Sequence, residues 1–208
     1  DDDPGALVDL DLKRLQFVRS HLTLAGASEL YRTALESLEK QTISHPSVGR
    51  VTLQIANTYR ESAALYQPLN SDDHKWDLKK AIALCESAIK RFPDSNEANA
   101  CANFLEEIKR KNLQATIEEQ NVPGLPFRAL VKYQNINQLY YRIIKTDRKS
   151  VEALREKFDK DYDVDNEQEL IKHFAAITPV KSGQYQLEND SDYQMHSVEV
   201  KLDELPVG

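Results

Sequence analysis

The sequence predicts an α+β protein in which antiparallel α-hairpins precede a small antiparallel β-sandwich-like domain with a helical insertion. Apolar residues recur with a period near 3.6 from residue 7 to about residue 111, and with a period of 2 in several runs after Asn112. A chain of 208 residues is long enough to bury two small cores. We therefore expect domains at 1–112 and 113–208, with the insertion at about 147–177.

Composition and charge narrow the class of partner. The chain is 40% apolar and 29% charged, which is typical of an ordinary globular protein. Its net charge of −7 argues against nucleic acid, because binding to phosphates depends on lysine and arginine. No run approaches the ~20 apolar residues that span a bilayer, so we expect membrane attachment only through an upstream anchor.

Five amphipathic helices are expected in the first domain. A break at Gly26 separates the first two, and Pro68 ends the third, because proline removes a backbone donor and clashes with the preceding turn. The short loops favour antiparallel neighbours. The apolar stripes cover residues 8–22, 27–38, 48–66, 78–92 and 98–108.

Alternating patterns predict strands in the second domain. The run from Phe127 to Gln134 alternates apolar and polar residues, and Asn135 and Asn137 separate it from a second run at 138–145. Shorter alternating runs follow at 185–187 and 198–202. Between these pairs of runs the helical period returns, which predicts the insertion.

One helical segment resembles a known repeat. In the stretch from Lys80 to Pro93, the small residues Ala81 and Ala88 and the closing Pro93 are similar to the second helix of a tetratricopeptide repeat (TPR). The aromatic residue expected at Cys85 is missing, and the loop before this helix exceeds the standard spacing. At most two and a half such repeats fit, so we expect these TPR-like hairpins to pack against the β domain for stability.

A second resemblance covers most of residues 26 to 208. The chain is similar to the N-terminal region of bacterial alpha-2-macroglobulin family proteins, especially those of Bacteroidetes. The likeness rests on a series of short matches in the right order. They include Arg91-Phe92-Pro93, Asn121-Val122-Pro123, Ala129-Leu130-Val131, Leu139-Tyr140-Tyr141-Arg142-Ile143 and Leu205-Pro206-Val207-Gly208.

This resemblance implies a segment of a very large exported protein that traps or inhibits proteases. It implies a periplasmic or cell-surface location, an anchor outside this chain, and contact with a target protease or with other domains of the parent. The trapping thioester needs a Cys-x-Glu-Gln motif, which the sequences after Cys85 and Cys101 do not supply. We therefore expect a non-catalytic scaffold.

In the family the chain continues beyond Gly208 into another apolar strand. We accordingly expect the β domain to end a strand short, with an open sheet edge or an edge-strand homodimer.

The alternative is a stand-alone TPR-type adaptor that binds a peptide or protein. Its candidate interaction surface combines aromatic residues with arginine, which suits interfaces. Tyrosine at helical spacing is also common in cores, so the two interpretations stay open. The surface consists of Tyr31, Arg32, Tyr59, Arg60 and Tyr66.

The two cysteines stand eight residues before and eight residues after Pro93. Cys85 and Cys101 therefore lie at similar heights on the two arms of one hairpin, where a disulfide is geometrically conceivable. The alternative is that both are small buried apolar residues at a helix crossing.

No motif predicts a metal, a cofactor or an enzyme. The acidic run at 159–167 has carboxylates on alternate residues, as in a calcium loop, but Asn166 replaces the glycine and Lys172 replaces the closing glutamate. We expect it to be a solvated connection. The five histidines lack metal spacing, and no nucleophile elbow or phosphate-binding loop occurs.

Overall fold

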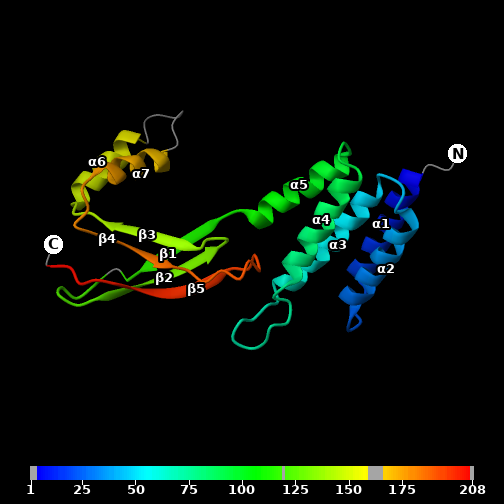
Figure 1. Cartoon of the computed structure of the whole chain (residues 1–208), viewed down its shortest axis with the longest axis horizontal. Helices are drawn as coiled ribbons and strands as arrows, with labels where there is room; N and C mark the ends of the chain where they lie inside the picture. The colour runs from blue at the N-terminus through cyan, green and yellow to red at the C-terminus, as the bar shows by residue number, and fades with distance from the viewer. Residues whose placement is uncertain (1–3, 119, 159–165, 207–208) are drawn as a thin grey trace. The chain divides into compact units, whose positions relative to one another are not determined.

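The computed structural model describes residues 4–118, 120–158 and 166–206, without the side chains of Phe158, Asn166 and Glu167. This part of the chain contains seven helices and five antiparallel strands in two small sheets, which confirms the α+β class (Figure 1). The elements are α1 (Pro4–His21), α2 (Ala27–Thr42), α3 (Val48–Ala63), α4 (Asp77–Arg91), α5 (Asn96–Lys109), β1 (Asn112–Ile117), β2 (Phe127–Gln134), β3 (Gln138–Ile143), α6 (Arg148–Phe158), α7 (Asn166–Ala176), β4 (Lys181–Gln186) and β5 (His196–Leu202).

The chain divides into two compact units. The first contains the residues up to Leu113 together with two short later segments, Tyr133–Asn135 and Asn189–His196. The second contains Gln114–Lys132, Ile136–Glu188 and the residues from Ser197 onward. The boundary between the two units therefore does not fall at a single position in the sequence.

In the first unit, successive helices pack against each other from α1 to α5. Gly26 precedes α2 with φ of 79°, a left-handed conformation that glycine adopts without strain. Ser95 caps α5, because its hydroxyl accepts a hydrogen bond from the Ala98 amide at 3.0 Å. Helix α3 ends at Ala63, earlier than the sequence predicts, because the chain turns there through a bond from Leu65 N to Ser62 O.

Two apolar clusters form the core of the first unit, and α3 contributes to both. One cluster joins α1, α2 and α3 and consists of Val8, Leu12, Tyr31, Leu35, Leu38, Val51 and Ile55. The other joins α3, α4 and α5 and consists of Ala56, Ala63, Leu78, Ala81, Ile82, Cys85, Ala88, Cys101, Phe104, Leu105 and Ile108. Small residues are frequent in the second cluster, so its helices lie close together.

In the second unit, one sheet has the strand order β1-β2-β5 and the other pairs β3 with β4. Strand β1 was not predicted; all six of its residues are exposed, so it lacks a buried stripe. The β3–β4 register places Tyr141 opposite Gly183, and the Tyr141 ring occupies the space that a side chain at Gly183 would need. Helices α6 and α7 connect these strands at one end (Figure 1).

Gly49 lies at a close approach between α3 and α5. A Cβ atom added there would lie 2.5 Å from the Cβ of Glu97. Replacing glycine by alanine inside an ordinary exposed helix stabilises it by up to ~1 kcal/mol. We expect Gly49→Ala to do the opposite and lower the free energy of unfolding by about 1–3 kcal/mol, because the helices must separate.

Urea unfolding of the wild type and the variant checks this expectation. The double variant Gly49→Ala, Glu97→Gly removes the opposing Cβ and should lose less stability than the two single changes summed. A Gly49→Ala protein that is more stable than the wild type would contradict the packing described.

Candidate functional site

The structure brings two of the predicted surface residues together. The Arg32 guanidinium lies 4.2 Å from the centre of the Tyr59 ring and donates hydrogen bonds to Thr58 Oγ1 at 3.0 Å and to Ser62 Oγ at 2.6 Å. The Arg32 side chain is only 11% exposed. These contacts join α2 to α3. The Arg32 side chain thus already has its hydrogen-bond partners within the first unit.

The other three predicted residues have different neighbours. Tyr31 is buried in the α1–α3 cluster, 4.7 Å from the Arg19 guanidinium. Arg60 is exposed and pairs with Glu107 of α5 at 3.0 Å. Tyr66 is half-buried in the loop after α3. The five residues therefore serve several separate contacts within the first unit.

Cys85 and Cys101 are both free thiols and fully buried where α4 packs against α5. A hydrogen bond between the two thiols, together with burial, raises the pKa of Cys85. A protonated, buried thiol is a poor nucleophile. The same hydrogen bond lowers the pKa of Cys101 against the effect of its burial, so the Cys85 thiol is the one that stays protonated.

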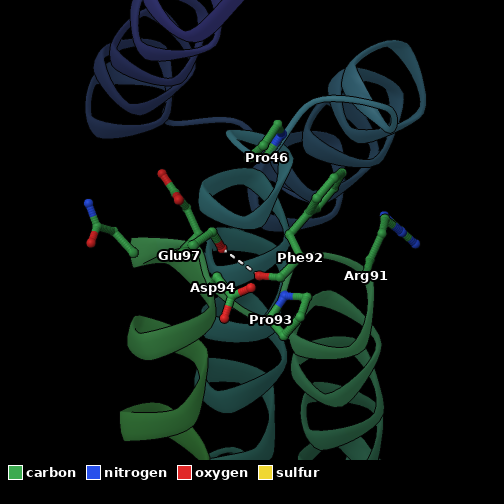
Figure 2. Close-up of a pocket in the computed structure, with 8 residues that line it drawn as sticks. Pro46, Arg91, Phe92, Pro93, Asp94 and Glu97 are labelled. Carbon is green, nitrogen blue, oxygen red and sulfur yellow. Dashed lines mark hydrogen bonds between the residues drawn. The ribbon is translucent and has the colours of Figure 1, made fainter.

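A pocket of about 540 Å³ lies at the turn between α4 and α5. Figure 2 shows Phe92 and Pro46 on one side of it, with Pro93 and Asp94 below them. The Ser95 hydroxyl donates to the Phe92 carbonyl oxygen at 2.8 Å, in addition to capping α5. The polar groups that line this pocket thus stabilise the turn between α4 and α5.

The segment Asn189–His196 contains a polar cluster that sequence reasoning missed. Asp192 is fully buried, and its Oδ1 accepts from His196 Nε2 at 2.9 Å and from the Gln194 amide at 3.0 Å. The His196 ring stacks on Tyr133 with 5.6 Å between ring centres. Among the described residues, the only buried side-chain oxygen or nitrogen without a hydrogen-bond partner is Asp192 Oδ2. The only sequence signal was the i, i+4 spacing of Asp192 and His196.

This segment is attached to the loop that precedes α4. Lys75 pairs with Asp190 at 2.7 Å, and Gln194 Nε2 donates to the His74 carbonyl at 3.3 Å. Tyr193 packs against the α3–α5 cluster despite a φ of 62°, which is unusual for a residue other than glycine. The carboxylate and the imidazole therefore hold a backbone segment in place.

Asp77 is a second buried carboxylate that the sequence did not single out. It lies in the first turn of α4, where a negative charge is favourable, and bonds to His74 at 2.9 Å and to Lys80 at 2.8 Å. Burial favours the neutral acid, but the hydrogen bonds from Lys80 and His74 outweigh it and hold the pKa of Asp77 below its ordinary value.

Within the part of the chain that the structure describes, no three metal-ligating side chains of His, Cys, Asp or Glu gather at one point. The acidic run at 159–167 lies outside the described residues. None of the described helices is both long and apolar enough to cross a bilayer.

No family model matches the sequence, and neither a curated protein nor a solved structure matches it.

The depressed pKa of Asp77 makes part of the stability depend on pH. This contribution is present above the ordinary aspartate pKa of about 3.9 and is lost as the pH falls through the lower pKa of the folded state. We expect Asp77→Asn to cost about 1–3 kcal/mol at neutral pH, because the two charged hydrogen bonds weaken.

Urea unfolding at neutral pH and at pH ~3 measures both effects. The gap between the wild type and Asp77→Asn should narrow in acid. Asp94, which is exposed at the α4–α5 turn, offers a matched control, because Asp94→Asn should change stability by less than ~0.5 kcal/mol. An equal loss of stability in Asp77→Asn and Asp94→Asn would contradict the stabilising role assigned to the hydrogen bonds of Asp77.

Proposed function

We propose that this chain is a non-catalytic scaffold and interaction segment of an exported alpha-2-macroglobulin-like protein, with TPR-like hairpins followed by a macroglobulin-type β domain. The family assignment comes from the sequence resemblance. In this proposal the parent protein traps or inhibits a protease, and this segment contacts the target or other domains of the parent.

The strand order is the observation that carries the proposal. In a Greek-key sandwich, the first, second and fifth strands share one sheet, while the third lies in the facing sheet. The described strands have this distribution, with β1, β2 and β5 in one sheet and β3 with β4 in the other. The order supports a sandwich-like domain built from the strands that the resemblance covers.

The charged groups of the first unit support a scaffold role. Arg32, Asp77 and Asp192 are largely buried, and each forms hydrogen bonds that tie its own element to a neighbouring side chain or segment. Polar groups fixed in this way specify which surfaces pack together. They are not aimed at a common point where a substrate could react.

The second candidate is the independent TPR-type adaptor. One observation favours it: α1 exposes large apolar residues, and an exposed apolar patch commonly marks a surface that binds another protein. These residues are Leu7, Leu10, Phe17 and Val18.

The size and location of the native polypeptide distinguish the two candidates. An antibody raised against this chain should detect a polypeptide far longer than 208 residues in the cell-envelope fraction. Incubation of that fraction with an active protease should yield a complex that contains both proteins. A cytosolic band of the length of this chain would overturn the proposal in favour of the adaptor.

Export also predicts the state of the two thiols. Because Cys85 and Cys101 are adjacent, we expect protein isolated from an oxidising compartment to carry a disulfide between them. Its intact mass should be lower than that of the reduced protein by two hydrogen atoms. Cys101→Ser should abolish the difference, and native protein with two alkylatable thiols after unfolding would contradict the expectation.

A further inference from the structure

Helix α1 is apolar on its exposed side as well as on its buried side. Val8 and Leu12 are buried in the cluster that α1 forms with α2 and α3. The other side carries four large apolar residues that are largely open to solvent: Leu7 (56% exposed), Leu10 (64%), Phe17 (65%) and Val18 (48%). A helix that is apolar all round is usually buried all round. Among the described residues, only the side with Val8 and Leu12 is covered.

The exposed residues of α1 form a straight row. Residues three or four positions apart lie on the same side of a helix. The row follows alternating steps of three and four residues, which is the spacing of a seam that packs against a second helix. Its length is about 21 Å, because each residue adds ~1.5 Å along the axis. We call this row the exposed stripe: Leu7, Leu10, Arg14, Phe17 and His21, with Val18 beside them.

The Phe17 ring is held in its exposed position. The centres of the Phe17 and His21 rings lie 4.2 Å apart. The His21 Nδ1 atom donates to the Phe17 carbonyl oxygen at 2.8 Å, which holds the His21 ring beside this turn of the helix. An aromatic side chain that is ordered before binding loses little conformational entropy when a partner covers it. Phe17 therefore suits the role of an anchor in an interface.

The charges at the centre of the exposed stripe are mainly positive. Arg14 is the central residue of the stripe, Lys13 precedes it, and both side chains are exposed. Asp11 pairs with Arg14 at 3.3 Å, but the Arg14 side chain stays 72% exposed, and exposed pairs contribute little. The other acidic residue of α1, Asp9, bonds to Arg50 of α3. The centre of the stripe is thus complementary to a negative charge.

A second copy of this chain is a poor occupant of the exposed stripe. If two stripes met in antiparallel orientation, with Leu10 of each copy opposite Phe17 of the other, the cations of both copies would meet at the centre. In parallel orientation, each Arg14 would face its counterpart. Like charges placed together in an interface oppose association. An anionic membrane also fits less well, because the net charge of −7 opposes approach to a negative surface.

We propose that the exposed stripe of α1 binds an amphipathic helix of a partner protein that carries an acidic residue at its centre. Apolar residues of this helix would cover Leu7, Leu10 and Phe17, and its carboxylate would pair with Arg14. Apolar residues at helical spacing anchor this mode of recognition. A single polar position within such a seam fixes the register of the two helices. The inference rests on the interaction role in the proposed function, and it names the surface and the kind of partner.

The test uses the whole chain and two fluorescein-labelled synthetic peptides of about 21 residues, long enough to form a helix. Both peptides carry leucine at heptad positions a and d, except at the central a position. One peptide has glutamate there and the other has lysine, and both are used at concentrations where they do not self-associate. Fluorescence anisotropy should show saturable binding of the glutamate peptide to the wild type. The lysine peptide should bind at least about tenfold more weakly.

Substitutions in the exposed stripe separate the charge from the apolar contact. Arg14→Glu should reverse the preference, so that the lysine peptide binds more tightly than the glutamate peptide. Phe17→Ser should weaken the binding of the glutamate peptide at least about tenfold, because it removes the anchor. Leu69→Ser is the matched control, since Leu69 is 99% exposed in the loop between α3 and α4. This control should bind the glutamate peptide as the wild type does.

Failure of the glutamate peptide to bind the wild type, or equal binding of the two peptides, would overturn the proposal. Equal binding of the glutamate peptide to Phe17→Ser and Leu69→Ser would also overturn it. If circular dichroism shows that Phe17→Ser does not fold, Leu10→Ser replaces it in each comparison, because Leu10 is also exposed and belongs to the stripe.

Two further results would assign the exposed stripe to another occupant and overturn the proposal. Self-association of the wild type that Phe17→Ser abolishes would indicate a second copy of the chain. Binding of the wild type, but not of Phe17→Ser, to phosphatidylglycerol vesicles would indicate a membrane. None of these outcomes affects the test of the native polypeptide's size and location.

Discussion

The close approach of α3, α4 and α5 is the constraint on which the first unit depends. Gly49 has room for no more than a hydrogen atom against Glu97, and Ala56 and Ala81 are fully buried in the cluster shared by these helices. Because interiors are densely packed, small residues at the crossings set the distance between the helices. This distance in turn brings the two thiols together and places α4 beside the segment that Asp192 holds.

Periodicity predicted the helices and most strands because their burial follows one face. It gave no signal for β1, since that strand has no covered face and hence no buried stripe. It placed the end of α3 too late, because the turn at Ser62 ends the helix before Pro68 becomes relevant. Elements whose limits are set by local turns or by exposed edges are thus the ones that the sequence pattern predicted least well.

The candidate site was harder to predict than the fold, because the residues that contact each other are far apart in the sequence. Arg32 and Tyr59 could be selected as residue types suited to contact, but their pairing with each other depends on how α2 packs on α3. The role of Gln194 depends on a bond to the carbonyl of His74, 120 residues away. Buried polar networks of this kind can be identified only from the three-dimensional arrangement of the helices and strands, because no short sequence motif encodes them.

The separation of the first unit into three stretches of sequence has a mechanical consequence. Tyr133–Asn135 and Asn189–His196 belong to the helical unit, while the chain on both sides of each belongs to the other unit. Unfolding of the helical unit would therefore also release Tyr133 and Gln134 at the end of β2 and His196 at the start of β5, because these residues belong to that unit.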